Sequence, residues 1–247
     1  ERSEGPNRKL CFMTSIFANV GVLFFFKYFN FFNENFSFIF SHLGLNYPLK
    51  NLNILLPIGL SFHTFQSMSY TIEVYLRRQK AEKHLGIYAL YVMFYPQLVA
   101  GPIERPQNLL HQFKEPIKPE YKKIVSGLKL MFTGLFKKIV IADQLAPFVN
   151  LVYEQPSAYP GLVHLVAVYF FSIQIFCDFS GYSDIAIGSA RVLGIDLMKN
   201  FNSPYLSTSF SDFWRRWHIS LSTWFRDYVY FPLGGNKYGT WIRRRNS

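Results

Sequence analysis

Apolar runs that are long enough to cross a lipid bilayer constrain the fold of this chain more than any other feature. Residues 10–32 form one such run and residues 161–177 form another, and a helix of roughly 17–25 residues crosses a hydrocarbon core of about 30 Å. Half of the residues are hydrophobic and only 17% are charged, whereas soluble domains are about 25% charged. The sequence therefore predicts an all-α, polytopic membrane protein in which residues 1–247 form a single integral-membrane domain, a bundle of several helices.

Three further segments are apolar but interrupted, which predicts re-entrant or broken helices within this bundle. Residues 85–103 have basic residues on both sides and are interrupted by Pro96 and Pro102, so a re-entrant hairpin fits them better than a simple crossing. Residues 52–76 are polar in their second half, which predicts that this half faces protein or water rather than lipid. Residues 124–153 contain lysines and predict two short helices or one long kinked helix.

The formal net charge of +11 does not indicate a nucleic-acid partner, because the basic residues gather in clusters between the apolar runs. Such clusters are typical of the cytoplasmic loops of membrane proteins, so we expect the lipid bilayer as a partner and no nucleic acid. Cys11 and Cys177 both lie in apolar surroundings and have no partner at the spacing of metal ligands. We expect both to be buried free thiols, and we expect no metal site.

Residues 211–236 contain three of the four tryptophans and predict one amphipathic helix, which would lie at a membrane surface or line a wet cavity. Ser211 or Asp212 would cap its first turn, and Pro232 with the glycines after it would end it. An aromatic stripe at helical spacing usually packs in a core, so a chemical role for His218 is the rarer interpretation. The stripe and the charged residues beside it comprise Trp214, Trp217, His218, Leu221, Trp224, Phe225, Arg215, Arg216 and Arg226.

Asp178, Ser180, Tyr182 and Asp184 form a polar stretch between two apolar runs. A charge buried in such a setting costs several kcal/mol unless it is paired or hydrated. Two structural interpretations are open: an ion pair of Asp184 with Arg191, or a turn in which Asp178 and Ser180 cap the next helix. The functional interpretation, a polar path for a substrate, has about equal weight because ionisable residues within a membrane are usually functional.

Several segments carry motifs whose combination is specific: residues 96–103 (PQLVAGPI), 174–184 (QIFCDFSGYSD), 202–205 (NSPY), 213–222 (FWRRWHISLS), 224–228 (WFRDY) and 232–236 (PLGGN). Together they resemble the membrane-bound O-acyltransferase family, in the branch that contains alginate O-acetyltransferase and D-alanyl transfer proteins. The resemblance covers most of the chain from about residue 52 onward.

The main catalytic histidine of that family lies in a later Trp-His-Gly motif. In this sequence the only Trp-His pair is Trp217-His218, and Ile219 follows it. We therefore expect the main catalytic histidine to lie beyond residue 247, and we expect both ends of the chain to be cuts through a longer protein.

The resemblance implies transfer of an acyl group, commonly acetyl, to a hydroxyl of an extracytoplasmic polysaccharide or cell-envelope polymer. The implied donor is a cytoplasmic thioester, either acetyl-CoA or a carrier-protein thioester, and no cofactor is expected to stay bound. The implied location is the inner membrane of a bacterium, with an extracytoplasmic transferase of the same pathway as partner. A transporter or channel, or a scaffold for a partner enzyme, is the alternative.

The resemblance also implies roles for individual residues. His218 would be a supporting catalytic residue that orients a group near the reacting carbonyl. Trp214 and Trp217 would join the substrate path of the polar stretch. The arginines of the stripe, Arg215, Arg216 and Arg226, would bind a phosphate-bearing donor, since guanidinium pairs with phosphate through two hydrogen bonds; anchoring to lipid headgroups is their other interpretation.

Overall fold

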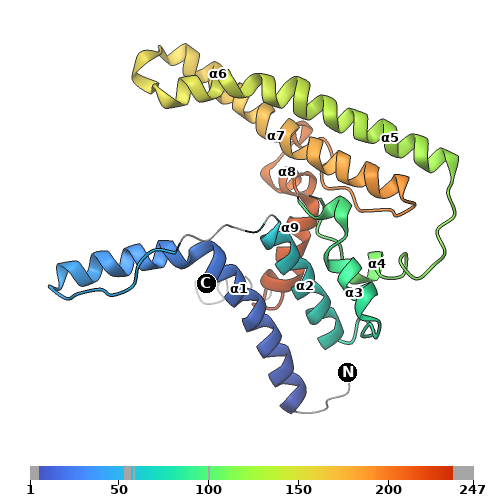
Figure 1. Cartoon of the computed structure of the whole chain (residues 1–247). Helices are drawn as coiled ribbons and strands as arrows, with labels where there is room; N and C mark the ends of the chain where they lie inside the picture. Colours follow the sequence, from blue (N-terminus) through green and yellow to red (C-terminus); the bar gives the residue numbers. More distant parts are fainter. Residues whose placement is uncertain (1–5, 53–56, 58, 100, 236–247) are drawn as a thin grey trace, which may run out of the picture. The chain divides into compact units, whose positions relative to one another are not determined.

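The computed structural model describes residues 6–52, 57, 59–99 and 101–235, and its regular elements within these ranges are all helical (Figure 1). This confirms the predicted all-α class. The chain divides into two compact units, one ending at Val92 and the other beginning at Met93, and each is described by itself. A single integral-membrane domain stays a prediction. Of the sequence motifs, Ala100 and Asn236 lie outside the described residues, as does the basic end of the chain, residues 243–245.

The first unit contains three helices, α1 (Pro6–His42), α2 (Leu60–Tyr75) and α3 (Leu85–Val92). The apolar run of residues 10–32 lies within α1, and the helix continues beyond it to His42. Asn33 is only 5% exposed, and its side-chain amide donates to Asn51 Oδ1 at 2.7 Å. The polar side chain is thus satisfied from outside the helix, and the helical backbone can continue through it.

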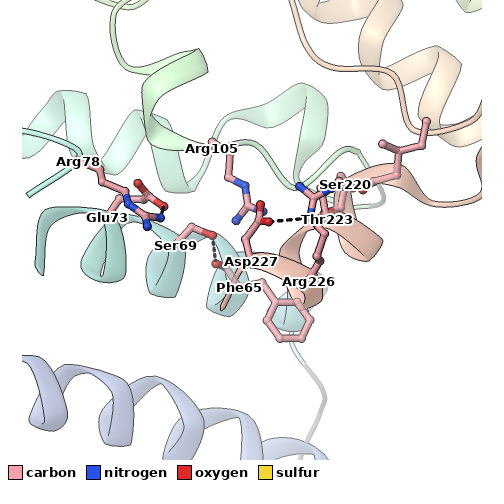
Figure 2. A network of polar contacts seen from close by, with 10 residues as sticks. Phe65, Ser69, Glu73, Arg78, Arg105, Ser220, Thr223, Arg226 and Asp227 are labelled. Atoms are coloured by element: carbon pink, nitrogen blue, oxygen red, sulfur yellow. Dashed lines mark hydrogen bonds and ion pairs between the residues drawn. The ribbon is translucent and has the colours of Figure 1, made fainter. Parts of the chain in front are cut away.

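The polar second half of α2 faces protein within this unit, as predicted for residues 52–76. Gln66 is 3% exposed and donates through Nε2 to the carbonyl oxygen of Tyr91 at 2.6 Å. The Ser69 hydroxyl donates to the carbonyl oxygen of Phe65 at 2.7 Å, within the same helix (Figure 2). The contact with Tyr91 satisfies a side-chain amide of Gln66 that lipid would leave without a partner, whereas the hydroxyl of Ser69 is satisfied within its own helix.

The second unit begins with an irregular stretch that contains the short turn η1 (Tyr95–Gln97) and the single-turn helix α4 (Pro106–Leu109). The helical break that we predicted at Pro96 is confirmed, since Pro96 lies in η1. Re-entry into the membrane stays a prediction. Between the two turns, Ile103 is 2% exposed and Glu104 is fully buried, so this stretch belongs to the core of its unit.

Two long helical segments form the scaffold of the second unit. The first consists of α5 (Tyr121–Leu135), the π-helical segment η2 (Phe136–Ala142) and α6 (Asp143–Glu154), which confirms the predicted long helix with an interruption. After the short turn η3 (Pro156–Ala158), α7 (Gly161–Val192) runs back beside α5 (Figure 1). The helix α7 is unbroken, so the predicted turn in the DFSGYSD motif was wrong.

Two pairs of glycines bring α5 and α7 into backbone contact. A Cβ atom on Gly134 would lie 2.5 Å from the carbonyl oxygen of Gly181, and one on Gly127 would lie 2.6 Å from that of Gly188. Each helix carries its two glycines seven positions apart, so the pairs match when the helices run in opposite directions. Small residues at a helix interface allow such close packing, which is common between helices in membranes.

The length and composition of two described helices, Asn7–His42 and Gly161–Val192, would allow them to cross a bilayer. They contain the apolar runs that we predicted to be membrane spans. The 16 residues of α2 fall short of the roughly 20 needed for a crossing. Residues 53–56 and 58, which belong to the same interrupted apolar segment, lie outside the described residues.

The chain after α7 forms short elements: η4 (Pro204–Leu206), α8 (Phe210–Arg216), α9 (Ile219–Phe225) and the π-helical segment η5 (Arg226–Tyr230). The prediction of one continuous helix over residues 211–236 was therefore wrong. The predicted cap was also wrong, because the hydroxyl of Ser209 accepts from the backbone N–H of Asp212 at 3.1 Å.

We expect Gly134→Ala to lower the thermal midpoint of the detergent-solubilised protein. The new methyl group would force α5 away from α7, and such overpacking costs about 1–3 kcal/mol, more than the roughly 1 kcal/mol that alanine gains over glycine as a helix former. Gly161→Ala is the matched control, because no atom lies within 4 Å of its added Cβ. Equal midpoints for the two variants would contradict the close contact of the helices.

Candidate functional site

The break between α8 and α9 falls at His218, whose backbone adopts the left-handed conformation with φ 43° and ψ 55°. This conformation costs a residue with a side chain about 1–2 kcal/mol. Residues held in such conformations occur often at active sites, where the surrounding structure has to enforce them. The position of the break therefore makes His218 a candidate functional residue and raises the question of what holds the turn.

Asn200 holds the turn from the segment that follows α7. Its carbonyl oxygen accepts from the N–H of Ile219 at 2.9 Å, and its Oδ1 accepts from the N–H of Ser220 at 3.3 Å and from the hydroxyl of Ser220 at 2.9 Å. Its Nδ2 donates to the hydroxyl of Ser183 on α7 at 3.2 Å. The side chain is 1% exposed. Asn200 thus provides hydrogen-bond acceptors for the first backbone N–H groups of α9, and this explains why one helix ends and another begins here.

Asn200 is a residue that sequence reasoning missed. Its signal was its place two residues before the Asn202-Ser203-Pro204-Tyr205 motif, but nothing in the sequence indicates which distant segment an asparagine binds.

The imidazole ring of His218 is packed between aromatic rings. The ring of Phe179 on α7 meets it edge-on, with centroids 4.6 Å apart and an interplanar angle of 89°, and the ring of Phe201 lies 6.4 Å away at 21°. Burial lowers the pKa of His218 to about 4. Its Nε2 is buried without a hydrogen-bond partner. The site therefore holds a neutral imidazole at pH 7 with one unused polar atom.

The two candidate tryptophans lie in different surroundings. Trp217 packs against Phe201 and Phe213, with ring centroids 5.1 Å and 5.5 Å away, and so belongs to the aromatic cluster around His218. Trp214 is 57% exposed. It lines an open cavity of about 600 Å³ with Ser207, Thr208, Ser209, Phe210 and Phe213. Phe213 therefore separates this cavity from Trp217.

The three candidate arginines do not converge on one point. Arg215 is exposed on α8. Arg216 Nε donates to Asp212 Oδ2 at 3.0 Å, and this contact lowers the pKa of Asp212. Arg226 Nε donates to Asp227 Oδ1 at 2.8 Å. Two of the three guanidinium groups thus already pair with carboxylates of their own helix.

The carboxylates of the DFSGYSD motif pair with lysines of the opposite segment. Lys137 Nζ lies 2.6 Å from Asp184 Oδ2, and Lys138 Nζ lies 2.5 Å from Asp178 Oδ1 and 2.8 Å from Asp143 Oδ1. The two lysines follow one another in η2, where the wider π-helical turn occurs. Single-turn π segments are often found at functional sites.

Of the open interpretations, an ion pair of Asp184 is confirmed, but its partner is Lys137 and not Arg191. Arg191 lies near Asp196 instead, with Arg191 Nε 3.8 Å from Asp196 Oδ1. Lys137 can reach Asp184 because the glycine contacts hold α5 and α7 close together. The predicted cap by Asp178 and Ser180 was also wrong, since both lie in the interior of α7. The two adjacent lysines inside an apolar run were a signal in the sequence that such pairs form. The sequence did not show which residues of α7 these lysines would face.

The four polar residues of the predicted path differ in exposure. Asp178 and Tyr182 are part of the half-exposed face of α7, with a side-chain exposure of 43% for Asp178 and a residue exposure of 41% for Tyr182. Ser180 is 1% exposed and its hydroxyl has no partner, while the side chain of Asp184 is 20% exposed. A path along this helix stays a prediction.

Neither thiol is in a disulfide, and their burial differs. Cys177 is buried as predicted, whereas Cys11 is exposed on α1 and that prediction was wrong. The apolar run around Cys11 does not cover it within its own unit. Among the described residues, no group of three or more histidine, cysteine, aspartate or glutamate side chains is placed to hold a metal ion.

Comparison with known proteins decides the family. The model of MBOAT, the membrane-bound O-acyltransferase family, matches residues 78–242, which is most of the chain. The chain belongs to this family. It is thus an integral membrane protein, and its apolar helices α1 and α7 fit that assignment.

The names of individual relatives in this family describe transfer to different polymers. The chain is 41% identical to the probable alginate O-acetylase AlgI of Azotobacter vinelandii, over 94% of the chain and 46% of the relative. It is 36% identical to the peptidoglycan O-acetyltransferase of Helicobacter pylori, over 98% and 50%. It is 32% identical to the teichoic acid D-alanyltransferase of Bacillus subtilis, over 77% and 48%. The chain spans about half the length of these curated relatives.

We expect the Lys137–Asp184 pair of this acyltransferase-family chain to show strong coupling in a double-mutant cycle. Lys137→Met or Asp184→Leu alone leaves a partly buried charge without its partner, and breaking a buried pair in this way costs about 3–5 kcal/mol. The double variant removes both charges, so it should recover part of the folded yield and the thermal midpoint. Additive losses would contradict a direct ion pair.

We expect the stability of the protein to fall with pH partly through His218. The pKa of His218 is about 4 in the folded protein and 6.5 in the ordinary reference state, so the unfolded chain binds the proton more readily. The stability contributed by the neutral ring is complete above pH 6.5 and is lost as the pH falls through 4. Thermal midpoints measured from pH 7 to pH 4 should therefore fall less for His218→Gln than for the unmodified protein. The variant His111→Gln, which changes an exposed histidine just after α4, is the control; parallel curves for all three proteins would refute the assignment.

Proposed function

We propose that this protein transfers an acyl group, in the simplest case acetyl, from a thioester to a hydroxyl of an extracytoplasmic polysaccharide or cell-envelope polymer. The relatives support this proposal, because their names describe O-acetyl or D-alanyl transfer to alginate, peptidoglycan or teichoic acid. In the reaction the acceptor oxygen bonds to the thioester carbonyl carbon, the carbon–sulfur bond breaks, and the hydroxyl proton ends on the thiol. Family membership favours this chemistry over the transporter and scaffold alternatives.

The structural observation that carries the proposal is the buried, unpartnered Nε2 of His218 in an enforced left-handed turn. A neutral imidazole that is held in place can donate a hydrogen bond to a carbonyl oxygen and stabilise the charge that develops on it. The low pKa of His218 keeps the ring neutral without making it an effective base near pH 7. His218 is therefore assigned an orienting role and not that of the general base.

The remaining candidate residues take supporting roles in this proposal. The open cavity beside Trp214 has a mainly aromatic wall with three hydroxyl-bearing residues, which suits an entering substrate. Of the three arginines, the exposed Arg215 is best placed to attract a phosphate-bearing donor, either acetyl-CoA or a carrier-protein thioester. Arg216 and Arg226 would first have to break their ion pairs with carboxylates. The polar residues Asp178, Ser180, Tyr182 and Asp184 would line the acceptor side.

The proposal also includes the cellular setting. The protein would lie in the cytoplasmic membrane of a bacterium, take its donor from the cytoplasm, and serve an extracytoplasmic transferase of the same pathway. Assay of acetyl transfer or donor hydrolysis by the full-length protein, with acetyl-CoA and with a carrier-protein thioester in parallel, tests the activity. Absence of turnover with both donors in properly folded protein would overturn it.

We expect His218→Ala to lower the transfer rate of the full-length, membrane-inserted protein by roughly 10²–10³-fold, the usual cost of one positioned donor at a reacting carbonyl. His218→Gln keeps a hydrogen-bond donor but cannot act as a base, so it should retain much of the activity. The rate is measured per folded molecule, and His111→Ala, at an exposed histidine just after α4, is the control. Equal loss in both His218 variants would indicate proton transfer instead, and no loss in either would return His218 to a packing role.

A further inference from the structure

Glu104 and Arg105 are consecutive residues whose side chains hold two different segments of the second unit. Neither belongs to the candidate site, and both lie in the irregular stretch before α4. Glu104 is fully buried, and the side chain of Arg105 is 15% exposed. Because buried charges are costly unless they are paired and hydrogen-bonded, the partners of these two residues indicate what the stretch does.

The Glu104 carboxylate holds the segment between α7 and α8. Its Oε1 accepts a hydrogen bond from the backbone N–H of Met198, and its Oε2 accepts from Asn108 Nδ2 at 3.4 Å. Burial raises the pKa of Glu104, and the hydrogen bond from Met198 opposes that rise. Met198 stands two residues before Asn200, the residue that binds both Ile219 and Ser220 beyond the His218 turn. Glu104 thus fixes the segment that enforces the turn.

The Arg105 guanidinium holds the other side of the turn, at the end of α9. Its Nη2 donates to Asp227 Oδ2 at 3.0 Å, and its Cζ lies 4.2 Å from the centroid of the Tyr228 ring. Figure 2 shows Arg105 facing Asp227, with Ser220 and Thr223 on the adjoining helix. Because the guanidinium both donates this hydrogen bond and lies over an aromatic face, Arg105 restrains both the position and the direction of this helix end.

The helix α9 needs restraint of this kind. It has seven residues, and isolated helices much shorter than about 12 residues are not stable in water. Its first residue follows a left-handed histidine, and its last is followed by the π-helical segment η5. Asn200 fixes the beginning of α9 and Arg105 fixes its end, so one dipeptide controls both supports.

We infer that Glu104 and Arg105 are positioning residues that hold the His218 ring in the orientation needed for transfer. The inference rests on the proposed role of His218. Neither residue needs to touch a substrate, because each acts on His218 through a segment that is bonded to the turn. Loss of either support would leave the helices in place and let the imidazole shift. A misplacement of about 1 Å at a reacting group can lower a rate by about 10²-fold.

A double-mutant cycle in the full-length protein tests this inference. Arg105→Gln should lower kcat by roughly 10- to 100-fold with little change in KM for the thioester donor, whereas Arg105→Lys, which keeps the charge but not the fork, should recover part of the rate. In a His218→Ala background, Arg105→Gln should lower the rate less than twofold further, because mutations that act through one group are not additive. A multiplicative loss in the double variant would overturn the inference. The matched control is Arg78→Gln, which removes an arginine of the first unit whose Nη1 lies 3.8 Å from Glu73 Oε1.

A second readout does not depend on turnover. Carbethoxylation of His218 by diethyl pyrocarbonate, followed by mass spectrometry of its peptide, reports the accessibility of the buried Nε2. The rate should rise several-fold in Arg105→Gln and in Glu104→Gln, and it should stay unchanged in Arg78→Gln. Asp227→Asn, a milder change in the same pair, replaces Arg105→Gln if that variant does not fold.

The two experiments separate the inference from the proposed function. If His218→Ala retains full activity, the role of His218 in transfer fails, while the modification rate still shows whether Glu104 and Arg105 position the ring. If His218→Ala is inactive but neither Glu104→Gln nor Arg105→Gln changes the modification rate, the positioning role is refuted and the proposed function stands.

Discussion

The contact between α5 and α7 is the constraint on which the second unit depends. Four glycines let the two backbones touch at the Gly127–Gly188 and Gly134–Gly181 pairs, and this contact fixes the register of the facing segments. With that register set, the lysines of η2 reach the carboxylates of α7 at hydrogen-bonding distance. A membrane helix can then carry two aspartates without leaving their charges unpaired. The glycines thus make the ion pairs possible, and the ion pairs allow α7 to remain a single helix.

The opposite face of α7 builds the candidate site. Phe179 supports the His218 ring, and Ser183 accepts the hydrogen bond that orients Asn200. Asn200 in turn supplies the acceptors that begin α9. One helix therefore connects the ion pairs on one side to the enforced histidine turn on the other. This arrangement explains why the DFSGYSD motif and the FWRRWHISLS motif, far apart in the sequence, belong to one structural unit.

The sequence predicted the class and composition of this site better than its geometry. The apolar runs, the interrupted segments and the separate motifs all identified a helical membrane protein, and the motifs identified its family. The predictions that failed share one cause. Local spacing made each of them reasonable: a continuous helix through His218, an Asp184–Arg191 pair and a cap at Asp178. In the folded chain, however, a residue from a distant segment binds at each position. Asn200 binds at the turn, and Lys137 and Lys138 bind the carboxylates.

The sequence by itself determined what must be buried and what must be paired, because hydrophobicity and charge are properties of single residues and of their local periodicity. It therefore determined the helical class, the membrane location and the identity of the candidate residues. Only the tertiary structure decided which residues meet. Register between α5 and α7 depends on where two backbones can touch, and the left-handed conformation of His218 depends on hydrogen bonds from Asn200. Neither has a signature within one segment, since both are set by atoms that the chain brings together only when it folds.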